Sequence, residues 1–256
     1  MSGNLEGRHA LVTGGGRGIG AAIATTLAGA GARVTILGRT TAELNETAAR
    51  LPGPALAVTA DVTDRTAVVR AFSEARAAAG EVSILVNNAG LAKSRPLAKS
   101  DEAFWRMMLE VNLTGAYHCA REALPAMRAA NWGRIVSVAS TAGLRGYAYC
   151  TAYCAAKHGL VGFTRALALE IAKTGITANA VCPGFTETGV VQDAVRAVSE
   201  QSARSESEAR QTLISFNPQQ RFVQPEEVAN AVLWLCSPGS ESMNGQSLAV
   251  AGGEVM

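Results

Sequence analysis

The chain has 256 residues, of which 48% are hydrophobic and 26 are glycine, so it can bury a full core and is too apolar for a disordered protein. Its 23 basic and 21 acidic residues give a net charge of +2, which argues against a nucleic-acid partner. No apolar run reaches the length of a membrane span and the first residues do not resemble a signal peptide, so we expect a cytoplasmic protein with no membrane partner.

Short apolar runs alternate with longer helical patterns along the chain, which predicts βαβ units and a parallel sheet buried on both faces. Strands are expected at residues 9–13, 32–37, 55–59, 82–86, 135–138, 177–181 and 246–250. Helices are expected between them, with Asp64 as an N-terminal cap, capping residues at the start of the segment Ser100-Asp-Glu-Ala-Phe-Trp, and Pro225 in the first turn of the last helix. No linker or repeat divides the chain, so residues 1–256 are predicted to form a single α/β domain.

The first predicted strand runs straight into a glycine-rich loop, Gly14-Gly-Gly-Arg-Gly-Ile-Gly20, after which a helix begins. Gly14, Gly18 and Gly20 allow a sharp turn and a close approach of the backbone to a pyrophosphate, which the helix N-terminus would hold. A glycine cluster by itself is common in loops, but its position between a first strand and a helix indicates a dinucleotide site.

The end of the second predicted strand indicates which dinucleotide is preferred. A protein that selects NAD usually has a carboxylate near this point to bind the ribose 2′-hydroxyl, whereas this chain has Gly38-Arg39-Thr40. Arg39 and Arg17 would meet a 2′-phosphate through charged hydrogen bonds that contribute about 1.5–3 kcal/mol each. The alternative is that both arginines are solvated surface charges. We therefore expect NADP(H) to be preferred and NAD(H) to be possible.

Polar residues also occur just after further predicted strands and inside a predicted helix. Asp61 follows the third strand and would accept a hydrogen bond from an adenine amino group. Asn87 and Asn88 follow the fourth strand, where ligands bind in an open α/β sheet, although their amides would serve equally well to cap backbone groups. Asn112 is a polar residue inside an apolar helical pattern, so it needs a partner or water.

The segment 140–157 suggests carbonyl chemistry. Tyr153 and Lys157 are four residues apart, which on a helix places them on one face. A nearby ammonium favours the phenolate, but lowering a tyrosine pKa from about 10 to about 7 requires roughly 4 kcal/mol, so a second positive charge such as an oxidised nicotinamide is implied. This pair also occurs by chance on solvated helices. Ser140, just after the apolar run 135–138, adds a hydroxyl that would polarise a carbonyl.

Neither the cysteines nor the histidines indicate a metal site. The five cysteines form no Cys-x-x-Cys pair, and reduced, buried thiols are the simplest interpretation. Cys154 lies beside Tyr153 and would at most line a pocket. The three histidines have no metal-ligand spacing, so no metal is expected.

Together, these motifs resemble the short-chain dehydrogenase/reductase family over essentially the whole chain. The matching segments are Thr13-Gly-Gly-Gly-Arg-Gly-Ile-Gly20, Asn87-Asn-Ala-Gly90, Asn112, Ser140, Tyr153-Cys-Ala-Ala-Lys157 and Cys182-Pro-Gly184. Within that family the chain looks most like β-ketoacyl reductases and polyketide ketoreductases, and residues 157–167 and 175–185 closely resemble the latter. The resemblance implies a Rossmann-type doubly wound sheet with helices on both faces, and a homotetramer rather than a dimer.

The resemblance also implies an oxidoreductase that passes hydride between NADP(H) and a ketone or secondary alcohol, most simply a β-ketoacyl thioester or a polyketide-like ketone. Ser140 would hold the carbonyl oxygen and Tyr153 would protonate it. Lys157 would lower the pKa of Tyr153 and bind the nicotinamide ribose, and Asn112 would hold a water that connects Lys157 to solvent. The expected cofactor-binding residues are Gly14, Gly16, Arg17, Gly18, Ile19, Gly20, Arg39, Asp61, Val62, Asn88, Ala89, Gly90, Tyr153, Lys157, Pro183, Gly184 and Thr188.

The substrate side is less specified. Residues 189–216 are expected to form a lid over the substrate, or else a surface helical hairpin. Lys93, Arg95 and Arg145 would attract a phosphopantetheine or coenzyme A group, unless they are ordinary solvated charges. A partly apolar pocket for an acyl or cyclic ketone would comprise Leu144, Tyr147, Tyr149 and Phe185. Apolar residues that would form a subunit interface, or face the sheet, are Ala116, Leu124, Leu160, Phe163 and Leu167.

Two alternative functions remain open. One is an NAD-dependent alcohol, steroid, sugar or 3-hydroxyacyl-CoA dehydrogenase. The other is a nucleotide-sensing protein without turnover, against which the complete set of Asn112, Ser140, Tyr153 and Lys157 argues. One departure from the family is Ala251-Gly-Gly253, where members commonly have Asp-Gly-Gly, and it bears on subunit contacts more than on chemistry.

Overall fold

Seven parallel strands form one sheet in the order β3-β2-β1-β4-β5-β6-β7 within the computed structural model, which describes residues 5–202 and 205–256. The order reverses between β1 and β4, which is the switch point where ligands bind in open α/β sheets. The strands are β1 (His9–Thr13), β2 (Arg33–Gly38), β3 (Ala55–Thr59), β4 (Ile84–Asn87), β5 (Gly133–Val138), β6 (Ile176–Pro183) and β7 (Ser247–Val250).

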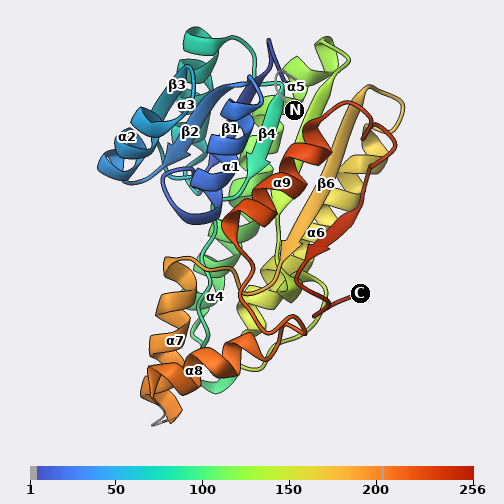
Figure 1. Ribbon diagram of the computed structural model, residues 1–256. Helices are drawn as coiled ribbons and strands as arrows, with labels where there is room; N and C mark the ends of the chain where they lie inside the picture. The colour runs from blue at the N-terminus through green and yellow to red at the C-terminus, as the bar shows by residue number, and fades with distance from the viewer. Residues whose placement is uncertain (1–4, 203–204) are drawn as a thin grey trace.

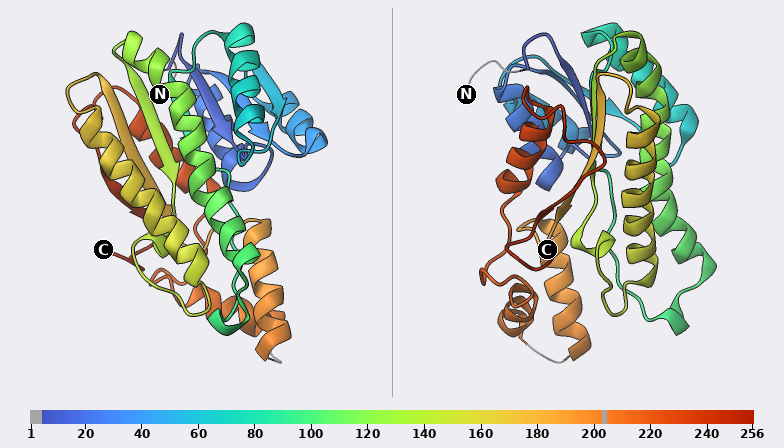
Figure 2. Two further views of the ribbon diagram at one scale, coloured as in Figure 1. Left: turned by 180° about the vertical axis from the view of Figure 1, so that it is seen from behind. Right: turned by 90° about the vertical axis from the view of Figure 1, so that its right-hand side faces the viewer.

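Helices cover both faces of this sheet (Figure 1, Figure 2). One face carries α1 (Gly18–Gly29), α2 (Thr41–Arg50) and α9 (Pro225–Cys236). The other carries α3 (Arg65–Ala79), α5 (Gly115–Ala129) and α6 (Thr151–Glu170), with α4 (Glu102–Leu109) leading into α5. The doubly wound α/β fold expected from the sequence is thereby confirmed.

Alternation along the strands explains the two cores. Ala10 and Val12 of β1 pack on the side of α1 and α9, whereas Leu11 packs on the side of α3 and α5. Because both faces are covered, the strands are continuously apolar instead of alternating with polar residues. Ala116, Leu160 and Leu167 are buried in the chain's own core, so they face the sheet and are not available for a subunit interface.

Local capping matches the sequence. Asp64 accepts hydrogen bonds from the amides of Thr66 and Ala67 at the start of α3, and Pro225 opens α9. At α4 the capping residue within the expected segment is Asp101, whose carboxylate accepts from the Phe104 amide at 2.7 Å. A carboxylate at this position also stabilises the helix by interacting with the positive end of its dipole.

The helical segment from α4 to α5 is not regular. Between the two α-helices, residues Glu110–Thr114 form a π-helical turn that contains the buried Asn112. Such turns widen a helix locally and are frequent at functional sites. The sequence pattern indicates a continuous helix here, so this turn was not predicted.

The expected lid contains two helices, α7 (Gly189–Ser202) and α8 (Glu206–Ile214), which extend below the sheet in Figure 1. Residues 203–204 of the predicted range lie outside the described residues. The chain leaves the sheet and returns at one place, because Thr186 and Val223 form a parallel bridge and the Glu187 amide donates to the Val223 carbonyl at 2.9 Å. Within the described residues, no helix has the length and apolarity required to cross a membrane.

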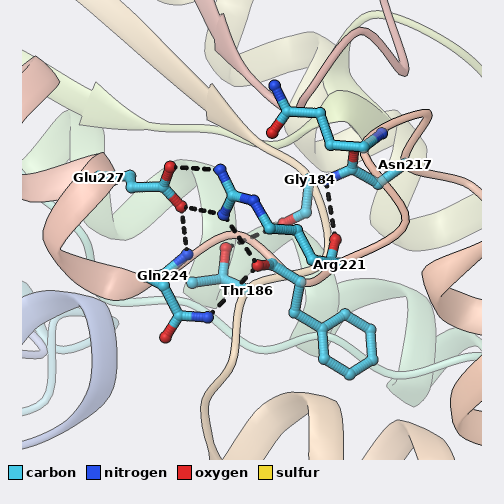
Figure 3. Close-up of polar contacts among 8 residues, drawn as sticks. Gly184, Thr186, Asn217, Arg221, Gln224 and Glu227 are labelled. Atoms are coloured by element: carbon cyan, nitrogen blue, oxygen red, sulfur yellow. Dashed lines mark hydrogen bonds and ion pairs between the residues drawn. The ribbon is translucent and has the colours of Figure 1, made fainter.

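Figure 3 shows how the returning segment is fixed beside this bridge. Arg221 makes two hydrogen bonds to the carboxylate of Glu227, at 2.6 and 2.7 Å. The same carboxylate accepts from the Gln224 amide, which closes the first turn of α9. Asn217 donates to the Arg221 carbonyl at 2.8 Å. The base of the lid is therefore attached to the N-terminus of α9, a core helix.

Candidate active site

The glycine-rich loop is shaped by contacts that exclude a side chain. A Cβ atom on Gly20 would lie 2.1 Å from the carbonyl oxygen of Gly14, so only glycine fits there. Gly14 and Gly18 have φ angles of 64° and 54°, in the left-handed region that glycine adopts without strain. The Gly14 amide is held by the Leu37 carbonyl at 2.7 Å, which fixes the loop to the end of β2.

The N-terminus of α1 fits an anionic ligand. Its cap residue, Arg17, has an extended backbone and makes no side-chain capping bond, and the first turn contains no acidic residue. The first amides of a helix have no partner within the helix and carry its positive dipole end. With the glycine loop directly before it, this helix end has the features of a pyrophosphate site, so the residues present fit a dinucleotide.

Asn88 supports the loop from the neighbouring strand. Its side-chain amide donates to the carbonyl oxygens of Thr13 and Gly14 at 2.9 and 3.2 Å, and its backbone amide donates to the Thr13 hydroxyl at 3.0 Å. Of the two interpretations open for this residue, backbone capping is therefore the one that the geometry favours. Both polar atoms of the Asn87 side chain are buried without a hydrogen-bond partner among the described residues.

The residues expected at the adenosine end lie around the loop. Arg39 follows β2 and is exposed, and it forms no ion pair within the described part of the chain. Arg17 is also exposed and lies 3.9 Å from Glu43. Asp61 accepts from both the amide and the hydroxyl of Thr63, at 2.9 and 2.8 Å, which fixes its carboxylate after β3.

Tyr153, Lys157 and Ser140 meet at the carboxyl end of β5. Tyr153 and Lys157 lie on one face of α6, with the Lys157 Nζ atom 5.8 Å from the centre of the Tyr153 ring. The hydroxyl of Ser140 accepts from the Ala142 amide at 3.1 Å and forms a hydrogen bond with the Tyr153 hydroxyl. The arrangement that the four-residue spacing predicts is present.

Burial opposes the expected activation of the tyrosine. It raises the pKa of Tyr153 to about 12, which the hydrogen bond with Ser140 only partly offsets. Burial also lowers the pKa of Lys157 to about 8, because the ammonium is removed from water. Lys157 does not by itself bring the phenol near neutral pH. As the 4 kcal/mol requirement implies, a further positive charge is needed.

Asn112 lies next to this group through the π-helical turn. Its amide oxygen accepts from the Leu91 amide at 3.1 Å, and its nitrogen donates to the carbonyls of Leu91 and Met108 at 3.0 and 2.9 Å. A Cβ atom on Gly90 would lie 3.0 Å from the Asn112 oxygen and 3.5 Å from the Lys157 nitrogen. Glycine at position 90 thus allows Asn112 and Lys157 to approach the same point.

The loop after β6 faces the glycine loop from the other side. A Cβ atom on Gly18 would lie 3.3 Å from the methyl group of Thr188, so these two loops are in contact distance. Pro183 ends β6, and the Gly184 amide donates to the Val250 carbonyl at 3.1 Å. The expected cofactor-binding segments therefore lie at the carboxyl ends of the strands.

On the substrate side, Tyr147 and Phe185 pack together, as the pocket prediction requires. Their ring centres are 6.3 Å apart, and Phe216, at the end of the lid, lies 5.9 Å from Tyr147. Tyr149 instead is 64% exposed and points away from the core. The structure adds Phe216 and Glu254, whose carboxylate accepts a hydrogen bond from Tyr147. Neither was identified from the sequence, because 107 residues separate Glu254 from Tyr147 and no local pattern connects them.

The basic residues near this region are partly engaged. Arg95 pairs with Asp101 at 3.2 Å and stacks over the Phe104 ring. Arg145 stacks over the Tyr147 ring, 5.1 Å from its centre. Lys93 is exposed. A surface cavity of about 280 Å³ lies elsewhere, between the β7 edge and the segment around Arg221, and none of the catalytic candidates lines it.

Comparison with known proteins places these observations in context. The model of the family described as short chain dehydrogenase matches residues 8–199. A D-beta-hydroxybutyrate dehydrogenase of Cupriavidus necator is 37% identical over 98% of this chain and 99% of its own. The 3-oxoacyl-acyl-carrier-protein reductase FabG of Escherichia coli is 38% identical over 99% of each chain. A crystal structure of an actinorhodin polyketide ketoreductase variant with NADPH matches with a TM-score of 0.94 and 37% identity, over 99% of each chain.

Proposed function

The chain belongs to the short-chain dehydrogenase family, and on that premise we propose that it is an NADP(H)-dependent ketoreductase. The observation that carries the proposal is the convergence of Ser140, Tyr153 and Lys157 beside the glycine-rich loop. Its proposed substrate is a β-ketoacyl thioester or a related polyketide-like ketone. Support comes from relatives named as a ketoacyl-type reductase and a polyketide ketoreductase.

The chain's own residues have distinct roles in this reaction. When bound, the cofactor supplies the hydride and the protein supplies orientation and electrostatics. Ser140 and Tyr153 donate hydrogen bonds to the carbonyl oxygen of the substrate, where negative charge develops. Tyr153 then transfers its phenolic proton to that oxygen. Lys157 stabilises the resulting phenolate, and Asn112 holds the Leu91 backbone beside it.

The cofactor would be held by residues from both halves of the chain. The α1 N-terminus and the glycine loop bind the pyrophosphate, and Asp61 binds the adenine end. Arg39 and Arg17 are the exposed cations that would select a 2′-phosphate over a 2′-hydroxyl. Lys157 binds the nicotinamide ribose, and Pro183, Gly184 and Thr188 line the nicotinamide.

A second candidate function is oxidation of a 3-hydroxy acid, since one relative is named D-beta-hydroxybutyrate dehydrogenase at 37% identity. The two candidates differ in cofactor and in the charge of the substrate. A nucleotide sensor without turnover is the less economical alternative, because Asn112, Ser140, Tyr153 and Lys157 are all present, with Ser140 and Lys157 beside Tyr153 and Asn112 beside Gly90.

The assembly is proposed to be a cytoplasmic homotetramer. Large apolar side chains remain exposed on the outer faces of the helices, including Trp105 of α4 at 39%, Tyr117 of α5 at 42% and Leu169 of α6 at 80%. Such side chains mark a protein interface where they form one contiguous patch. Sedimentation equilibrium distinguishes a tetramer from a dimer.

A matrix of cofactors and substrates tests the proposed function. For reduction, NADPH and NADH are each combined with acetoacetyl-coenzyme A, acetoacetyl-N-acetylcysteamine and cyclohexanone. For oxidation, NAD and NADP are each combined with D-3-hydroxybutyrate. The reaction is followed by stopped-flow absorbance of the reduced nicotinamide. Highest kcat/KM for NADPH with a thioester supports the ketoreductase. Preference for NAD and hydroxybutyrate supports the second candidate, and no turnover with any pair supports the sensor.

A further inference from the structure

Glu254 lies between the two segments that flank the proposed reacting site. Its carboxylate accepts a hydrogen bond from the Tyr147 hydroxyl, which is also within 2.7 Å of the hydroxyl of Thr141, the residue after Ser140. On its other side the carboxylate abuts Gly184, because a Cβ atom there would lie 2.8 Å from the second carboxylate oxygen. The carboxylate is thus connected to Ser140 through Tyr147 and Thr141, and it lies beside Gly184, the residue after Pro183.

The segment after β7 is held in this position by its backbone. Gly252 and Gly253 have φ angles of 60° and 93°, which turn the chain back towards the sheet. A Cβ atom on Gly252 would lie 2.0 Å from the amide oxygen of Asn217, so the turn packs directly against the base of the lid. Asn217 is itself fixed to the Arg221 carbonyl (Figure 3). Glu254 is therefore held beside Tyr147 by packing as well as by its hydrogen bond.

The charge of Glu254 is not neutralised by a direct partner. No cation forms an ion pair with it within the described part of the chain, and its second oxygen is buried without a hydrogen-bond partner there. Burial raises the pKa of Glu254, while the hydrogen bond from Tyr147 and the charge of Arg145 oppose this effect. Tyr147, which donates to this carboxylate, packs against the rings of Phe185 and Phe216, and such apolar rings screen a charge less than water does.

From these contacts we infer that Glu254 is a specificity-determining residue, which makes the site reject ketones that carry a carboxylate near the reacting carbonyl and accept uncharged ones. This inference rests on the proposed function and narrows its substrate class to neutral β-keto compounds such as thioesters and esters. Free β-keto acids would have to bring a second negative charge beside Glu254, in a partly water-excluded site.

Three ketones with one skeleton and different charge test the inference. They are acetoacetate, which is anionic, methyl acetoacetate, which is neutral, and acetonyltrimethylammonium, which is cationic. Wild type should show a higher kcat/KM for the ester than for acetoacetate. Glu254→Gln keeps an oxygen that accepts from Tyr147 but removes the charge. It should raise kcat/KM about fivefold for acetoacetate and lower it about fivefold for the cation, as expected for unit charges several ångströms apart, with the ester changed less than twofold.

Two further variants separate charge from structure. Glu170→Gln removes an equal charge from the exposed last residue of α6, at the opposite end of the helix from Tyr153. It should leave kcat/KM unchanged for all three ketones. Tyr147→Phe removes the hydrogen bond but keeps the carboxylate, and should preserve the wild-type order of the three ketones. If Glu254→Gln unfolds, Glu254→Ala replaces it, because it removes the same charge and should change kcat/KM for acetoacetate and for the cation in the same directions.

The outcomes also distinguish this inference from the proposed function. The role of Glu254 is overturned if kcat/KM for the charged ketones, relative to the ester, does not change in Glu254→Gln or changes equally in Glu170→Gln. Reduction of the ester by wild type would in that case still support a ketoreductase. If wild type reduces none of the three ketones nor the thioesters with either cofactor, the proposed function itself fails, and the inference fails with it.

Discussion

The ammonium nitrogen of Lys157 donates a hydrogen bond to the carbonyl oxygen of Val138 at 2.9 Å. Val138 ends β5, two residues before Ser140, so this bond fixes the catalytic helix to the strand that presents the serine. An ammonium has three donors, and the remaining ones are available on the side of Tyr153 and Gly90. The catalytic group is therefore anchored to the sheet.

Replacing Tyr153 by phenylalanine should remove at least 99.9% of ketone reduction, about a thousandfold loss, because no other described side chain is placed to donate the proton. NADPH affinity should change less than about threefold, since the glycine loop and α1 are untouched. Steady-state kinetics and NADPH fluorescence titration measure the two effects. Activity within tenfold of wild type would contradict the assignment of Tyr153.

The pH dependence of reduction should follow Lys157. Burial lowers its pKa to about 8, so the ammonium is lost as the pH rises through that value, while Tyr153, with a pKa of about 12, stays protonated. We expect kcat/KM for ketone reduction to fall above pH 8. In Lys157→Arg the guanidinium remains charged, so the falling limb should move to higher pH although activity is lower overall. A profile that is flat from pH 7 to 9.5, or unchanged in the variant, would refute this origin.

Arg39→Asp should shift cofactor preference from NADPH towards NADH by about tenfold to a hundredfold in the ratio of kcat/KM values. The new carboxylate repels a 2′-phosphate and accepts from a 2′-hydroxyl. The matched control is Arg128→Asp, which changes an exposed arginine in the last turn of α5 and should leave the ratio unaltered. If the ratio of kcat/KM for NADPH to kcat/KM for NADH does not change in Arg39→Asp, Arg39 is only a surface charge.

Two glycines of one helix should respond in opposite directions to alanine. In Gly20→Ala the new Cβ meets the Gly14 carbonyl at 2.1 Å, so the loop must shift, at a cost of about 1–3 kcal/mol in unfolding free energy and at least tenfold in NADPH affinity. In Gly29→Ala nothing lies within 4 Å, and we expect a small stabilisation, up to about 1 kcal/mol. Urea unfolding and NADPH titration test both; equal effects at the two positions would exclude the steric explanation.

Stability should decrease on mild acidification because of His9. Its ring bonds to the Gly80 carbonyl at 2.7 Å and the Thr35 hydroxyl at 2.9 Å, and burial lowers its pKa. The unfolded state therefore takes up a proton first as the pH falls below about 6.5, which favours unfolding. His9→Gln should flatten the decline in unfolding free energy between pH 7.5 and 5.5, and His158→Gln, at an exposed histidine, should not. The same slope in all three proteins would rule out His9.

Several parts of the candidate site could be read from short segments. The loop Gly14–Gly20 and the pair Tyr153 and Lys157 are arranged by local geometry, a strand-turn-helix and one helical turn, which sequence spacing specifies directly. The π-helical turn around Asn112 could not be predicted, because no residue type in this segment distinguishes it from a regular helix. The pKa values of Tyr153 and Lys157 also escaped prediction, because they depend on burial by distant segments.

Hydrophobic periodicity, glycine spacing and helical spacing act over a few residues, so the amino-acid sequence alone was enough to predict the α/β class, the dinucleotide site and the catalytic candidates. Contacts between distant segments were needed to show that Ala116, Leu160 and Leu167 pack inside the chain, and that Thr186 pairs with Val223 at the base of the lid. Tertiary packing also brings Glu254 to Tyr147 across 107 residues. Such contacts arise when loops at one edge of a sheet close on each other, and no local pattern encodes which side chains then meet.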